Sequence, residues 1–155
     1  MHIRFIKKEN DKHVLTCTRK DGTVTWMNLD GFFLRHDLLH YSVETSLNYR
    51  HAFYGMLANG VSISDFELPK EKRNIVFTDE AVYAEHIVNL IMVENACGKF
   101  DDFNQKLHDS LHQANSGLNG ITLTAGQMQA IHACYDALID QWQRLSEGKT
   151  MSLEF

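Results

Sequence analysis

The sequence predicts an α+β domain in which an N-terminal three-stranded antiparallel meander packs against about four helices. Up to about residue 30, the chain alternates polar and apolar residues or is rich in β-branched and aromatic types, as strands are. Apolar residues then recur at helical spacing, with capping residues before some of these segments. The 155 residues are 44% hydrophobic and 23% charged, which suits a single globular domain over 1–155.

The strands come first. Residues 2–5 (HIRF) alternate polar and apolar side chains, the pattern of a half-buried strand. Residues 13–19 and 23–29 follow, and the Asp-Gly pair between them predicts a hairpin, because glycine accepts the positive φ of a tight turn. The last five residues, MSLEF, alternate again. We therefore expect a final strand at 151–155 that returns to the N-terminal sheet.

Four helices are expected after the meander. The first, from about 35 to 58, has apolar residues every four positions and ends at an Asn-Gly pair. The second, from 79 to about 96, follows a threonine cap and has few polar positions, which predicts a largely buried helix. The third is amphipathic and is defined by Phe100, Phe103, Leu107 and Leu111. The fourth follows a Thr-x-x-Gln capping box at 124–127 and runs to about residue 147.

Two segments between the helices read as connections. Residues 61–77 contain the only proline and a charged cluster, so we expect a connecting segment there, with room for a short strand at 74–77. Residues 115–120 (NSGLNG) predict a loop.

Charge and cysteine usage exclude some classes of protein. The net charge is −5 with neutral histidines, and the absence of a lysine or arginine run argues against nucleic-acid binding. Cys17, Cys97 and Cys134 are far apart and form no CxxC pair, which suits a reducing compartment. The N-terminal residues lack the apolar core of a signal peptide, and the apolar stretch at 87–93 is too short to span a bilayer. We expect a cytoplasmic protein with no nucleic-acid or membrane partner.

The segment HDLLHYSVE at 36–44 is the sharpest functional signal. On a helix, His36 and His40 are four residues apart and lie on one face, with Cβ atoms about 6 Å apart. Two imidazoles at this spacing can reach one ion of the zinc or iron class, as they do in the HExxH motif. Zinc is the first expectation, with iron or manganese as alternatives.

The third ligand is open. Glu44 extends the same column, but it lies about 12 Å from His36 along the helix axis, too far for one ion to bind all three side chains of a straight helix. Three arrangements remain: the histidine pair with a ligand from elsewhere, which we prefer; His40 with Glu44; or Glu44 orienting His40. The candidates for the missing ligand are Glu44, His51, Glu85, His86 and Glu94.

A structural role for the histidines is a serious alternative. Histidines that border a core often only hydrogen-bond to a neighbour, and a chain with nine histidines readily contains an i,i+4 pair by chance. The sequence alone slightly favours this structural role for His36 and His40. It favours it more strongly for a second pair, His108 and His112, which sits on a more polar helix.

The stretch TRKDGTVTWMNLDG followed by HDLLHYSVETSLNYRHAFYGMLANG resembles a family of small uncharacterised bacterial proteins. In that family an Asp-Gly hairpin precedes a helix with an HDLxHYxVE motif. The resemblance covers about residues 16–60 and brings no established activity. It implies that His36, Asp37, His40 and Glu44 belong to one unit.

Two groups of zinc proteins are similar by analogy. In HExxH metalloproteases, the glutamate after the first histidine acts on the metal-bound water. Asp37 occupies that place here and is one methylene shorter. The zinc-binding proteins of coenzyme Q biosynthesis carry HDxxH followed by a more distant glutamate. His36, Asp37 and His40 match the first part, but Ala52 stands at the expected distance.

These observations lead to one leading hypothesis and one alternative. His36, His40 and Glu44 are the candidate metal ligands, and Asp37 and Glu44 are the candidate catalytic residues, as proton acceptors or as partners of the histidines. The expected reaction is metal-assisted hydrolysis of a small molecule, or a related Lewis-acid step. The alternative is a non-catalytic protein-interaction or regulatory module in which the histidines are structural.

Overall fold

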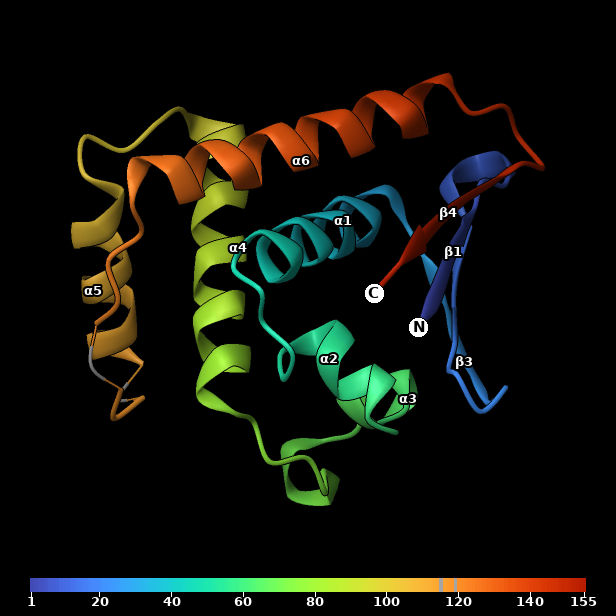
Figure 1. The fold of residues 1–155 in the computed structure, drawn as a ribbon, viewed down its shortest axis with the longest axis horizontal. Coiled ribbons are helices and arrows are strands. Elements are labelled where there is room, and N and C mark those ends of the chain that lie inside the picture. The colour runs from blue at the N-terminus through green and yellow to red at the C-terminus, as the bar shows by residue number, and fades with distance from the viewer. Residues whose placement is uncertain (115, 119) are drawn as a thin grey trace.

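The fold is one antiparallel sheet with the helices gathered on one of its faces (Figure 1). The computed structural model describes residues 1–114, 116–118 and 120–155. The strands are β1 (His2–Ile6), β2 (His13–Thr18), β3 (Val24–Leu29) and β4 (Thr150–Glu154). The α-helices are α1 (Gly31–Ser46), α2 (Phe53–Ala58), α3 (Ile63–Glu67), α4 (Asp79–Cys97), α5 (Phe103–Gln113) and α6 (Ala125–Arg144), and short 3-10 helices are η1 (Glu9–Asp11) and η2 (Lys70–Lys72). The α+β class is confirmed.

The sheet has the order β3-β2-β1-β4. Ile3 of β1 lies opposite Cys17 of β2, and β4 pairs antiparallel along the other edge of β1. The three-stranded meander is thus confirmed, and the strand predicted at 151–155 joins it. The inward residues Ile3, Phe5, Leu15 and Cys17 are fully buried, as the period-two pattern predicts.

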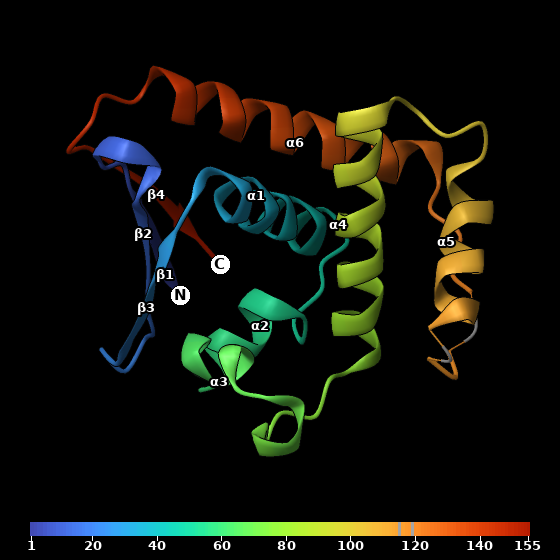
Figure 2. The same cartoon turned by 180° about the vertical axis from the view of Figure 1, so that it is seen from behind.

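Helix α1 lies in the middle of the helical layer, where it contacts α2, α4, α6 and β3 (Figure 2). Asp30 begins the helix, because its side chain accepts a hydrogen bond from the Phe33 N–H. Neighbours on several sides bury polar as well as apolar residues of α1, including Asp37, His40 and Glu44. Buried polar groups need partners, so the surroundings of these three side chains define their roles.

The helix predicted at 35–58 is wrong in its extent, because the chain leaves the helix after Ser46 and starts again at Phe53. The buried Glu44 carboxylate explains the break: it accepts hydrogen bonds from the Tyr54 and Gly55 N–H groups and so caps α2 after the chain has turned back. Only glycine fits at 55, since a Cβ there would lie 2.2 Å from the Arg50 carbonyl oxygen.

Helix α4 packs against α1 and also against α5 (Figures 1 and 2). It begins at the predicted threonine cap, where Thr78 accepts a hydrogen bond from the Ala81 N–H. It ends at Gly98, whose φ of 102° suits glycine. The buried residues form one stripe that includes Ala84 and Ile87, whereas Val93 is 44% exposed. The helix is therefore less buried than the sequence predicts.

The connecting segments differ in detail from expectation. Residues 61–77 contain α3 and η2, and 74–77 do not form the strand considered there. Val76 is 86% exposed, so its β-branched side chain has no sheet to pack against. In the loop predicted at 115–120, residues 115 and 119 lie outside the described residues.

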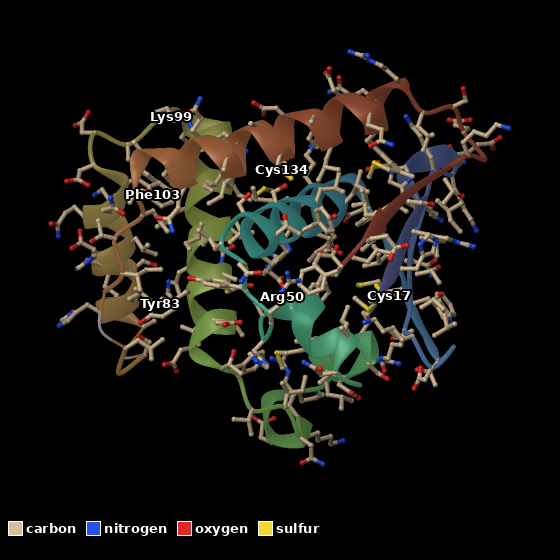
Figure 3. The ribbon with its side chains drawn as sticks, viewed as in Figure 1. Cys17, Arg50, Tyr83, Lys99, Phe103 and Cys134 are labelled. Carbon is tan, nitrogen blue, oxygen red and sulfur yellow. The ribbon has the colours of Figure 1, made fainter. Side chains whose placement is uncertain are left out.

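The three cysteines are free thiols in different parts of the fold. Cys17 lies on β2 and Cys134 on α6 (Figure 3), and Cys97 is the last residue of α4. Within the described ranges, no helix combines the length and the apolar character needed to cross a membrane.

Candidate metal centre

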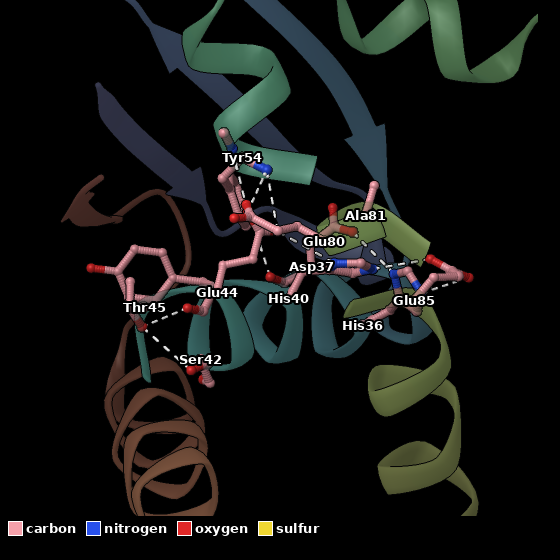
Figure 4. A network of polar contacts seen from close by, with 12 residues as sticks. His36, Asp37, His40, Ser42, Glu44, Thr45, Tyr54, Glu80, Ala81 and Glu85 are labelled. Atoms are coloured by element: carbon pink, nitrogen blue, oxygen red, sulfur yellow. Dashed lines mark hydrogen bonds and ion pairs between the residues drawn. The ribbon is translucent and has the colours of Figure 1, made fainter. Parts of the chain in front are cut away.

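Three side chains from α1 and α4 meet at one point (Figure 4). His36 and His40 lie on successive turns of α1, with ring centroids 4.7 Å apart. Glu85 approaches both rings from α4: its Oε2 is 3.2 Å from His40 Nε2, and its Oε1 is 3.9 Å from His36 Nε2. One carboxylate thus faces the outer nitrogens of both histidines.

The distances suit a single ion. One ligand atom from each of His36, His40 and Glu85 can be chosen so that all three atoms lie within 4.8 Å of one another. Ligand atoms around a tetrahedral zinc ion, each about 2.0–2.2 Å from it, are separated by about 3.4 Å. Small side-chain shifts would therefore bring this group to ligand geometry.

Each histidine also has a carboxylate close to its Nδ1 atom, on the side of the ring away from Glu85. His36 Nδ1 lies 3.3 Å from Asp37 Oδ1. His40 Nδ1 lies 3.5 Å from Glu44 Oε1, which is an ion-pair contact and not a hydrogen bond. Both rings therefore stand between a buried carboxylate at Nδ1 and the shared Glu85 at Nε2. In metal sites, such carboxylates behind the rings hold the imidazoles in orientation and tautomer.

The two inner carboxylates are anchored differently. Glu44 is fully buried, and its oxygens accept the Tyr54 and Gly55 N–H groups at 3.0 and 3.3 Å. The Oδ2 atom of Asp37 is also buried, but it has no hydrogen-bond partner among the described residues. Glu44 is thus held by the fold, whereas Asp37 keeps one acceptor atom without a partner.

The charges of the cluster reinforce one another. Burial by itself lowers the pKa of His40, but the Glu44 and Glu85 carboxylates outweigh it and raise the pKa to about 9. Burial likewise opposes the charge on His36, yet contacts with Asp37 and Glu85 raise its pKa. The contacts with His36 and His40 hold the pKa of Glu85 far below its ordinary value. Without an ion, the carboxylates around the two rings therefore favour the protonated form of both histidines.

The cluster forms part of the wall of a cavity of about 670 Å³. This volume falls within the range of small-molecule sites. The polar lining residues are His36, Asp37, His40 and Glu85 together with Asn28, Arg73 and His86. The rest is apolar: Met27, Phe33, Phe53, Met56, Ile63, Phe66, Phe77, Ala81 and Val82. Because the Glu85 side chain is 52% exposed, the centre is open toward solvent on this side.

The other candidates for a third ligand lie elsewhere or have other partners. The His51 side chain is exposed, and the Glu80 carboxylate accepts a hydrogen bond from its backbone N–H. His86 Nδ1 lies 2.6 Å from Ser110 Oγ of α5. Glu94 accepts hydrogen bonds from Lys99 Nζ and the Phe100 N–H at the end of α4. Glu85 is therefore the candidate that the structure brings to the histidine pair.

The remaining sequence expectations are placed as follows. Glu44, a candidate ligand and catalytic residue, stands behind His40 and is absent from the three-residue group that faces the cavity. Asp37 touches His36 and lines the cavity. His108 and His112 lie on α5, and in the part of the chain that the structure describes they belong to no group of three side chains that could hold a metal ion.

Sequence reasoning missed the cavity residues from the connecting segment, namely Ile63, Phe66, Arg73 and Phe77. Arg73 and Phe77 lie outside helices and strands, so no periodicity could have revealed them. No family model, no curated protein and no solved structure matches this chain.

Proposed function

We propose that His36, His40 and Glu85 bind one divalent metal ion, zinc first, and that the protein uses it to hydrolyse a small molecule in the adjoining cavity. The observation that carries the proposal is that each histidine lies between a carboxylate of its own helix and the Glu85 carboxylate, which the two histidines share. A chance i,i+4 pair needs one hydrogen-bond partner for each ring. Here each ring has a carboxylate from its own helix within 3.3–3.5 Å of Nδ1, and both rings face the same partly exposed glutamate.

The donor set indicates the class of ion. Two imidazoles and one carboxylate with a free side form the ligand set of catalytic zinc, and iron(II) enzymes use the same set. A zinc ion held in this way lowers the pKa of a coordinated water to about 7 and polarises a bound carbonyl or phosphoryl group. Asp37, whose Oδ2 has no hydrogen-bond partner among the described residues, is the proposed proton acceptor, and Glu44 is a positioning residue for His40.

A second candidate is a binding module without a metal. It is favoured by the His40–Glu85 contact of 3.2 Å, which satisfies the outer ring nitrogen with no ion present. Exposed apolar side chains such as Trp26 at 60% and Phe32 at 58% would then belong to a partner surface. In this alternative, the histidines and Glu85 are a structural ion-pair network.

Metal content measured by elemental analysis on untagged protein tests the proposal. We expect about one equivalent of zinc, iron or manganese in the parent protein, and none in a folded His36→Ala, His40→Ala variant or in Glu85→Gln. The matched control is His108→Ala, His112→Ala, which removes the same side-chain types at the same spacing from α5 and should keep the metal.

A folding control and one further outcome complete the test. Circular dichroism must show the parent spectrum for each variant, so that loss of metal reports on ligands and not on unfolding. Parent protein that contains no metal, even after incubation with each ion, would overturn the proposal and favour the binding module.

A further inference from the structure

The cavity has one continuous aromatic wall that starts at the histidine pair. His40 and Phe53 have ring centroids 5.5 Å apart, Phe53 and Phe66 are 5.2 Å apart, and Phe66 and Phe77 are 6.2 Å apart. All four rings line the cavity. An extended wall of this kind favours a ligand with an apolar body, whose burial is the main source of affinity in such sites.

A cation lines the same cavity. Arg73 lies in the chain between Phe66 and Phe77, and its Nε donates a hydrogen bond of 2.6 Å to the Leu68 carbonyl oxygen. This bond ties the Arg73 side chain to the segment between Phe66 and Phe77, the last two rings of the wall. Among the described side chains that line the cavity, Arg73 is the only arginine or lysine.

The Arg73 guanidinium has N–H donors that can bind a ligand. Its terminal nitrogens make no hydrogen bond to a described residue, and the side chain is only half-buried. A guanidinium presents a planar set of N–H donors that matches a carboxylate or a phosphate, and charge-assisted bonds of this type are among the strongest in proteins.

We propose that the ligand of this cavity is an elongated amphipathic anion, with its apolar body along the Phe53–Phe66–Phe77 wall and its anionic group on Arg73. This inference rests on the proposed function only in placing the reacting group of the ligand at the metal site. The reacting group of a substrate would lie at His36, His40 and Glu85, while the anionic group stays at Arg73 and sets the orientation.

Calorimetric titration of the full chain with three matched probes tests this assignment: 4-phenylbutanoate, 4-phenylbutan-1-ol and 4-phenylbutylamine. The protein is first treated with a chelator, so that a carboxylate cannot bind through a metal ion. We expect the anion to bind about tenfold or more tightly than the alcohol, and the amine to bind most weakly. Arg73→Gln should lower the affinity for the anion to that for the alcohol.

Controls separate this proposal from the metal site. Lys72→Gln removes an exposed cation one residue away, outside the cavity lining, and should leave all three affinities unchanged. Zinc content should be the same in Arg73→Gln as in the parent. The protein could take up no metal and still bind the anion through Arg73. That result would support this inference and contradict the proposed hydrolysis.

Three results would overturn the inference. They are equal affinity for the anion and the alcohol, an unchanged affinity for the anion in Arg73→Gln, and no measurable binding of the anion to the chelated protein. Any of these would leave the metal proposal untouched, because the metal content is measured without the probes.

Discussion

At the scale of single residues, what distinguishes the centre is the surroundings of the two histidines. His36 and His40 differ in burial, yet both have Nδ1 against a carboxylate from their own helix. Asp37 follows His36 directly, and Glu44 lies one turn beyond His40. Both relations are local in sequence, so the same short segment supplies the rings and the groups that orient them.

The role of Asp37 can be tested by removing its charge. Asp37→Asn keeps the shape of the side chain but replaces the carboxylate behind His36 with a neutral amide. We expect zinc affinity to fall roughly 10–100-fold, the usual cost of losing such an orienting group. Competition with a chromophoric chelator measures the affinity. Asp109→Asn, which alters a partly buried residue of α5 that contacts Gln105, is the control and should leave the affinity unchanged. Equal affinities in all three proteins would contradict the orienting role.

At the scale of elements, the centre depends on how the start of α4 is fastened to the turn between α1 and α2. Glu80 Oε2 accepts the N–H groups of Arg50 and His51 at 2.7 and 2.6 Å. Thr78 Oγ1 donates a 2.7 Å hydrogen bond to the His51 carbonyl oxygen. These contacts hold the turn that leads to Phe53 against the helix that carries Glu85. They thus connect two walls of the cavity.

This connection predicts a loss of stability in Glu80→Ala. The substitution leaves two backbone N–H groups without their charged acceptor, and we expect the free energy of unfolding to fall by about 1–2 kcal/mol, at the low end because the site is partly exposed. Urea denaturation followed by circular dichroism measures it. Asp79→Ala removes a neighbouring acid from the same helix start and controls for the helix dipole, which contributes about 0.3–1 kcal/mol. If both variants lose the same amount, the Glu80 contacts contribute nothing of their own.

At the scale of the whole molecule, the candidate ligands join two helices that are far apart in sequence. His40 and Glu85 are separated by 45 positions. An ion bound between α1 and α4 would therefore cross-link the central helix to the helix that packs against it, and unfolding would have to release the ion.

Binding should therefore raise the thermal midpoint. With free zinc at about 100 times its dissociation constant, the stabilisation is about 2.7 kcal/mol, which corresponds to about 5–11 °C for a chain of this size. Differential scanning calorimetry with and without zinc measures the shift, and a chelator should reverse it. The His36→Ala, His40→Ala variant should show no shift, while His108→Ala, His112→Ala should show the full one. A shift shared by both double variants would place the bound ion elsewhere.

The extent of the predicted helix at 35–58 shows why local patterns mislead. Apolar spacing continues past Ser46, so the pattern favours one helix, yet the buried Glu44 carboxylate takes the Tyr54 and Gly55 N–H groups and the chain turns back. A rule based on periodicity cannot predict a side chain that accepts a hydrogen bond from the backbone ten residues later.

The strands, the main helices and the histidine pair with Asp37 and Glu44 follow from alternation, helical spacing and capping residues. These are properties of neighbouring positions, and neighbouring positions can be read from a sequence. Which of several candidate side chains would complete the cluster depended on the packing of α4 against α1, and that packing selected Glu85. The aromatic wall likewise joins rings from α1, α2, α3 and the irregular stretch after η2, which also supplies Arg73. Only the tertiary structure decides such contacts, because they join residues whose separation along the chain has no fixed relation to their separation in space.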